Sequence, residues 1–178
     1  MAKLSELEGC VLGLVETQGP LTPYAVRKVF LDSASPHWSG SAGAIYPLIR
    51  RLEERALLKS EAHRTGSRRS RLYRSTATGR RVLRRWVGPP IPDWVVAVPV
   101  DSLRTRLSFL VVLSRADRIA FVTNATRMIE AHIRTVREHP RAARPEPFEE
   151  LVDRGVLIML EARRTWLGEV TTALKRRG

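Results

Sequence analysis

The sequence predicts a mainly α-helical protein with one small β-hairpin. Apolar residues recur at intervals of three and four over most of the 178 residues, which is the pattern of helices that bury one side. Two short segments, 57–64 and 69–74, are instead extended in character, and the turn-forming run 65–68 joins them. One hairpin among helices is therefore expected.

A proline-rich run divides the chain into two parts. Residues 89–92 contain three prolines, which a helix cannot accommodate in its interior. We predict an N-terminal domain over residues 1–87, a linker over 88–102 and a C-terminal helical dimerisation domain over 103–178.

The first two helices have clear start signals. Ser5 and Glu8 have the spacing of a capping box and predict a helix that ends at Gln18-Gly19-Pro20. Thr22-Pro23 predicts the second helix, because a capping hydroxyl is followed by proline at the first helical position. A loop rich in Ser, Pro and Gly is expected over residues 32–40.

A third helix is expected to begin near Ser41. Its apolar stripe is formed by Ile45, Leu48, Ile49 and Leu52. Pro47 lies inside this helix, where we expect it to remove a backbone hydrogen bond to Gly43 and to bend the first turn.

The hairpin is followed by a fourth helix, which Thr76 caps and which ends at Val87. Three helices, a hairpin and another helix follow one another in the order of a winged helix-turn-helix. In that arrangement the third helix enters the major groove of DNA, and the hairpin lies along the DNA backbone. The N-terminal domain is therefore predicted to be a winged helix-turn-helix domain that binds DNA.

The C-terminal part is predicted to contain a short helix and two long ones. The short helix falls within 103–111. Ser114 and Asp117 cap the first long helix, which His139-Pro140 ends, and the second runs from Phe148 to about residue 176. The apolar residues of this last helix have nearly heptad spacing, which is typical of helices that pair.

The formal charge of +13 is placed unevenly. Residues 1–87 hold sixteen Lys and Arg against seven Asp and Glu, and nine arginines without any acid lie between Arg64 and Arg85. Such a run attracts polyanions through Coulomb forces and counterion release. The alternative is an ordinary solvated charged face, although such faces usually carry compensating acids.

Composition argues against several other classes. The single cysteine, Cys10, excludes an internal disulfide and a zinc–cysteine cluster, and it is expected to be inert rather than a redox sensor. The four histidines do not form a metal set, and the acids form no nuclease-like cluster. No enzyme activity, metal or cofactor is therefore expected. Without a membrane span of about 20 apolar residues or a signal-peptide pattern, a cytoplasmic location is expected.

Several stretches resemble the PadR-like family of transcriptional regulators. They are Val11-Leu12-Gly13-Leu14 with Gly19-Pro20-Leu21, Tyr24, Gly43-Ala44-Ile45-Tyr46-Pro47 leading into Arg51-Leu52-Glu53, and Arg71-Leu72-Tyr73 through Gly79. The resemblance covers residues 4–87 well, whereas 101–176 match only in general pattern. Three positions depart from the family: Pro23 and Ala56 replace common glycines, and Ser75 replaces a common leucine.

This resemblance implies a sequence-specific, nucleoid-associated regulator, in most members a repressor, that binds double-stranded DNA as a homodimer. The operator would be pseudo-palindromic, and a small-molecule or protein effector would release the DNA. The alternative is a non-specific RNA- or DNA-binding architectural protein without catalytic activity, which the charge alone would also fit.

The third helix is expected to supply the groove-facing residues. Gly43 allows close approach to the sugar-phosphate backbone, and Ser41 can bond a phosphate. Tyr46 can contact phosphate or a thymine methyl, whereas Arg50 can contact guanine or phosphate. Arg51 lies beside this set, and its alternative role is to solubilise the helix.

The remaining predicted contacts lie outside that helix. Phosphate or minor-groove contacts are expected from the hairpin residues Arg64, Arg68, Arg69 and Arg71. Tyr24 is expected either to bond phosphate or to pack against the third helix. The predicted dimerisation residues are Ile129, Ile133, Phe148, Val152, Met159, Trp166 and Val170. Trp94 and Trp166 are candidates for a ligand pocket, since the resemblance implies that some relatives bind flat aromatic molecules.

Overall fold

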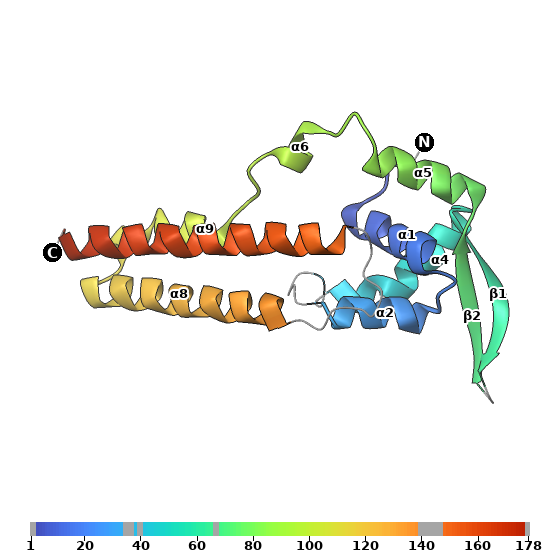
Figure 1. Ribbon diagram of the computed structural model, residues 1–178, viewed down its shortest axis with the longest axis horizontal. Coiled ribbons are helices and arrows are strands. Elements are labelled where there is room, and N and C mark those ends of the chain that lie inside the picture. The colour runs from blue at the N-terminus through green and yellow to red at the C-terminus, as the bar shows by residue number, and fades with distance from the viewer. Residues whose placement is uncertain (1–2, 34–37, 39–40, 66–67, 139–147, 177–178) are drawn as a thin grey trace. The chain divides into compact units, whose positions relative to one another are not determined.

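The structure is a computed structural model, and it describes residues 3–33, 38, 41–65, 68–138 and 148–176 (Figure 1). The side chains of Thr65, Arg68 and Glu149 lie outside the description. The chain is mainly helical with one hairpin, as predicted, and it divides into two compact units, Met1–Val98 and Pro99–Gly178. The domain limits at residues 87 and 103 stay a prediction.

The helices α1 (Glu6–Gln18) and α2 (Pro23–Leu31) begin where the sequence predicts. The Ser5 hydroxyl accepts the Glu8 N–H at 3.3 Å, and the Glu8 carboxylate accepts the Ser5 N–H at 3.0 Å. The Thr22 hydroxyl accepts a backbone N–H of the first turn of α2 at 3.1 Å. These side chains satisfy N–H groups that have no partner inside a helix.

The third helix of the domain differs from the prediction at its start. Ser41–Ala44 form a 3₁₀ turn, and the α-helix α4 (Ile45–Glu54) begins only after it. Pro47 is therefore the third residue of α4. Because the N–H groups of a first turn have no partner inside the helix, Pro47 removes no such bond, and the 3₁₀ turn stands where the first turn of the α-helix is expected.

The predicted apolar stripe of α4 faces the core of the first unit. Each of its four residues is at most 1% exposed, and burying one such side chain contributes about 2 kcal/mol. The stripe therefore fixes which side of α4 faces outward. The core also contains buried residues of α1 and α2, namely Val11, Leu12, Val15, Val26 and Phe30.

The hairpin consists of β1 (Leu58–Thr65) and β2 (Arg68–Ser75), which pair antiparallel. Both strands lie within one residue of their predicted limits. Leu21 forms an isolated bridge with Tyr73, through backbone hydrogen bonds of 2.8 and 3.2 Å. This bridge attaches the loop between α1 and α2 to the base of the hairpin.

The backbone at the end of α4 has a conformation that favours glycine, although this chain has Ala56 there. The Ala56 N–H donates to the Glu53 carbonyl at 2.8 Å, and the Leu57 N–H donates to the Leu52 carbonyl at 2.9 Å. This is the Schellman pattern of helix ends, which requires a left-handed residue after the helix. Ala56 has that conformation, with φ of 53°, at a position where the family commonly has glycine.

Replacing Ala56 by glycine is expected to stabilise the protein. Glycine adopts a positive φ without the steric cost that alanine has, so a gain of up to about 1 kcal/mol and a Tm rise of about 2–4 °C are expected. Thermal unfolding followed by circular dichroism measures this change. The matched control Ala120→Gly, at an exposed position inside a helix, should lower the Tm. A Tm of Ala56→Gly at or below wild type would contradict the argument.

The fourth helix, α5 (Ala77–Val87), is capped by Thr76, whose hydroxyl accepts a backbone N–H at 2.9 Å. Its Trp86 ring lies directly over Gly9, where an added Cβ would stand 2.5 Å from ring carbons. Only glycine leaves room for that ring. The chain then forms a short helix, α6 (Asp93–Val96), which the sequence does not predict.

The second unit contains α7 (Ser102–Leu107), the 3₁₀ turn η2 (Leu110–Val112), and the long helices α8 (Arg115–Glu138) and α9 (Glu149–Arg176). The helices α8 and α9 run side by side (Figure 1). They bury a small core of Leu110, Val122, Ile129, Ile133 and Leu167. No helix in the described part of the chain is long and apolar enough to cross a membrane.

Candidate nucleic-acid interface

The outward side of α4 carries the residues that the sequence predicts to face DNA. Tyr46 and Arg50 are one helical turn apart and therefore project from the same side. Tyr46 is 46% exposed, and Arg50 and Arg51 are also exposed. A Cβ added to Gly43 would meet nothing within 4 Å, so the backbone there is open to an approaching partner. Ser41 is half-buried at the first residue of the 3₁₀ turn.

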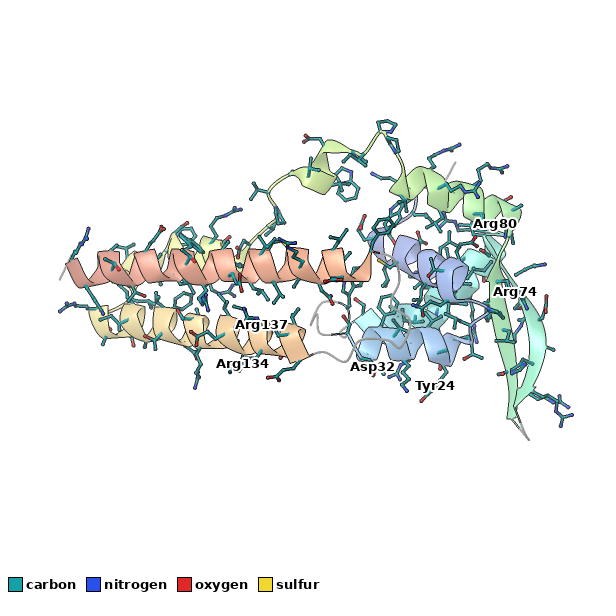
Figure 2. The ribbon with its side chains drawn as sticks, viewed as in Figure 1. Tyr24, Asp32, Arg74, Arg80, Arg134 and Arg137 are labelled. Atoms are coloured by element: carbon teal, nitrogen blue, oxygen red, sulfur yellow. The ribbon has the colours of Figure 1, made fainter. Side chains whose placement is uncertain are left out.

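Tyr24 lies at the second residue of α2, and its side chain points away from the helix bundle (Figure 2). It is 64% exposed, so most of the ring is outside the core. Its hydroxyl is therefore available to a partner molecule.

Two of the predicted hairpin arginines face each other across the strands. Arg64 and Arg69 are paired in the register, and both are exposed. Like charges placed directly opposite repel each other, and an anion between them would remove that repulsion. Arg68 lies at the first position of β2, and its side chain falls outside the described residues, as do residues 66–67 of the predicted turn.

Arg71 makes a contact that the sequence does not predict. Its guanidinium pairs with the Glu53 carboxylate at 3.2 Å, and that carboxylate also accepts the Ser60 hydroxyl at 2.5 Å and the Tyr73 hydroxyl at 3.4 Å. Burial and the nearby Glu53 charge raise the pKa of Tyr73. In the free protein Arg71 therefore attaches the hairpin to the end of α4.

A second ion pair holds the other side of that helix end. Arg55 Nη1 lies 2.9 Å from Glu8 Oε1, which joins the residue after α4 to the first turn of α1. Burial by itself would raise the pKa of Glu8, but the hydrogen bond from the Ser5 N–H and the Arg55 guanidinium together lower it. Glu8 therefore stays ionised well below neutral pH.

These residues give the first unit a surface of hydroxyl groups, arginines and open backbone. Phosphate groups and base edges are bound by such groups. Among the residues that the structure describes, no group of three or more His, Cys, Asp or Glu could hold a metal ion.

The comparison with protein families decides the class of this domain. Residues 11–85 match the family model described as "Transcriptional regulator PadR-like family". Residues 11–85 are a PadR-like transcriptional regulator domain. The resemblance that the sequence motifs predict is therefore confirmed.

Several solved structures are similar to this chain over nearly its whole length, and not only over the PadR-like domain. The PadR of Bacillus subtilis in complex with operator DNA has a TM-score of 0.76 at 20% identity, over 96% of this chain and 99% of that chain. The PadR-like transcriptional regulator BC1756 from Bacillus cereus has a TM-score of 0.76 at 23% identity, over 98% and 99%. The Bacillus subtilis PadR in complex with p-coumaric acid has a TM-score of 0.72 at 20% identity, over 95% and 98%. At these identities the likeness shows the fold, which confirms the predicted winged-helix class. No curated protein sequence matches the chain.

The predicted dimerisation residues fall into two groups outside the PadR-like domain. Ile129 and Ile133 are buried against α9 of the same chain, and Val170 packs against that core. Phe148, Val152 and Met159 are more than 60% exposed, and Trp166 is half-buried. The structure therefore assigns the first group to the core of the second unit and leaves the second group on its surface.

Trp94 lines a cavity of about 470 Å³ in the first unit. Trp86 at the end of the PadR-like domain lines the same cavity, and Lys3 Nζ lies 5.2 Å from the centroid of the Trp94 ring. Trp166, the other tryptophan predicted to bind a ligand, is not among the lining residues. The position of Trp86 in the sequence does not indicate that it lines a cavity, because that role depends on the path of the chain after α5.

Cys10, in α1 of the PadR-like domain, is expected to react slowly with thiol reagents. Burial, and then the Glu6 carboxylate, raise the pKa of its thiol to about 11. Below about 0.1% of the thiol is then ionised near neutral pH, and the thiolate is the reactive form. The rate of modification should rise about tenfold per pH unit between neutrality and this pKa. Rapid modification of the folded protein at neutral pH, as fast as in urea, would contradict this expectation.

Proposed function

We propose that this protein is a sequence-specific DNA-binding transcriptional regulator that acts as a repressor at a pseudo-palindromic operator. The observation that carries the proposal is the outward side of α4, where Gly43, Tyr46 and Arg50 are open to a partner. The solved complex of Bacillus subtilis PadR with operator DNA supports it, because that protein has the same fold.

In this proposal α4 lies in the major groove and the hairpin follows the backbone. Arg50 reads a guanine edge or binds phosphate, and Tyr46 contacts phosphate or a thymine methyl. Phosphate contacts come from Tyr24, Ser41, Arg51 and the hairpin residues Arg64, Arg68 and Arg69. Arg71 would have to exchange Glu53 for phosphate, so we assign it a weaker role.

The dimer is proposed to form through α9. This helix exposes a row of large apolar side chains, whereas its other side packs on α8. Isolated exposed apolar residues are common, but a continuous row on one helix marks an interaction surface. A two-fold dimer would place two copies of α4 about 34 Å apart, one turn of the duplex. The exposed row consists of Phe148, which directly precedes α9, and Leu151, Val152, Ile158 and Met159 within it.

The function requires no catalytic residue, and its location would be the nucleoid. We assign residues 1–87 to DNA binding, 88–102 to the linker and 103–178 to dimerisation.

The alternative is a non-specific architectural protein, and selection of binding sites from random duplexes distinguishes the two. The purified protein is incubated with a random duplex library, and the enriched sequences are tested at one fixed salt concentration. Enrichment of one palindromic site supports the proposal, whereas equal affinity for random duplex and RNA overturns it.

Release by an effector is proposed to use the cavity beside Trp94. Its volume suits a small ligand, and its walls are mostly apolar, with Lys3, Glu6 and Arg85 as the charged lining residues. Since Bacillus subtilis PadR has a complex with p-coumaric acid, aromatic acids are the first compounds to test.

The test is the rise in Tm that each aromatic acid causes. The rise should disappear in Trp94→Ala and persist in Trp166→Ala, which removes the other candidate tryptophan. Loss of the rise in Trp166→Ala alone would contradict the assignment to this cavity. An aromatic acid that raises the Tm but leaves operator binding unchanged would contradict its role in release.

A further inference from the structure

A second cationic site lies at the base of the hairpin. Lys59 of β1, Arg74 of β2 and Arg80 of α5 line a cavity of about 400 Å³. Figure 2 shows Arg74 and Arg80 at the same end of the first unit, where α5 meets the hairpin. Three elements of the fold thus contribute one cation each to a single hollow.

The positive charges of this site have little compensation within the protein. Lys59 and Arg74 are directly opposite in the hairpin register, where like charges repel. Both are exposed, and neither side chain makes an ion pair or hydrogen bond with the described residues. Arg80 donates to the Ser75 carbonyl at 3.3 Å, which does not neutralise its charge.

Glu16 is the acidic residue in the lining, but its carboxylate is already engaged. It accepts the hydroxyl of Ser75, a side chain that is 7% exposed. One carboxylate against three cations leaves the cavity with a net positive charge. The site is therefore suited to an anion that carries more than one negative charge.

This site is separate from the outward side of α4. Side chains of a strand alternate between its two faces, so Lys59 and Arg74 lie on the face opposite to Ser60 and Tyr73. The latter pair is the one that hydrogen-bonds Glu53 at the end of α4. An anion held by Lys59 and Arg74 would thus not compete with the groove contacts of Tyr46 and Arg50.

We propose that Lys59, Arg74 and Arg80 form a phosphate-binding site distinct from the DNA-reading surface. Guanidinium and ammonium groups that line one cavity favour a phosphate group over a monovalent anion. The phosphate belongs either to a small phosphorylated molecule or to the backbone of DNA that flanks the operator.

Pyrophosphate is the probe for the first source. At constant ionic strength it should raise the Tm of the wild-type protein, and its affinity should fall at least about tenfold in Lys59→Gln and Arg74→Gln. The control Arg81→Gln removes the same charge from an exposed position of α5 outside the cavity, and its affinity should be unchanged. Without pyrophosphate, Arg74→Gln should be at least as stable as wild type, because the opposed pair has lost its repulsion.

The second source is tested with duplexes that contain the selected operator with and without additional flanking base pairs. Weaker binding of Arg74→Gln to the long duplex alone, with Arg81→Gln unaffected, assigns the phosphate to flanking DNA. If Arg74→Gln and Arg81→Gln change the affinity for pyrophosphate and for the long duplex equally, the proposed phosphate site is wrong. Because Arg74 does not contribute to the α4 surface, failure here leaves the proposed regulator function intact.

Discussion

Replacing Tyr46 and Arg50 together by alanine is expected to weaken operator binding about 100-fold or more. Each contact to a base edge or phosphate contributes about 1–3 kcal/mol, and 1.4 kcal/mol corresponds to tenfold in affinity. Both side chains point out of the core, so the Tm should stay within about 2 °C of wild type. Gel-shift titration with the selected site, compared with a scrambled duplex, measures the loss.

The control for this prediction is Arg134→Ala. Arg134 is an exposed arginine of α8 (Figure 2), so the variant loses one positive charge without changing the outward side of α4. Its operator affinity should match wild type. If the Tyr46/Arg50 double variant binds the operator as tightly as the control, α4 is not the DNA-reading helix.

The double substitution Val152→Glu and Met159→Glu is expected to produce monomers. Both side chains are more than 60% exposed in the single chain, so the helix itself should fold normally. In a dimer they would be buried, and burying unpaired carboxylates costs several kcal/mol per group. Sedimentation equilibrium should show the wild-type protein at twice the chain mass and the variant at the chain mass. Operator affinity should fall with it, because a monomer binds one half-site only.

A matched variant places two acids elsewhere on the same unit. Thr123→Glu and Arg127→Glu both lie at exposed positions of α8, one turn apart. This variant should remain dimeric. A wild-type protein that is monomeric at micromolar concentration, or a dimer that survives the α9 substitutions, would show that α9 does not form the interface.

Local signals in the sequence predict most of the fold. The caps by Ser5, Thr22, Thr76 and Ser114 all occur as expected, because each involves a side chain and a backbone group at most three residues away. The buried stripe of α4 is likewise visible in its spacing alone. The residues on the outward side of α4 can therefore also be predicted from the sequence, since residues opposite a buried stripe face solvent.

Contacts between distant segments are what the sequence does not show. Arg71 is eighteen residues from Glu53, and nothing in the spacing of either residue indicates that they pair. The two sides of α9 are both apolar, so heptad spacing could not decide which side packs on α8 and which stays exposed. The cavity lined by Lys59 and Arg80 likewise depends on the strand register and on how α5 leaves the hairpin.

The network around Glu53 has a consequence for how a duplex is selected. Because this one carboxylate binds Ser60, Tyr73 and Arg71, it ties the end of α4 to the hairpin and restrains the span between them. In the proposed complex with DNA, this span would have to match the distance between a major groove and the adjacent backbone. Duplexes whose local groove width differs from that span should be discriminated against even when their base sequence at α4 is correct.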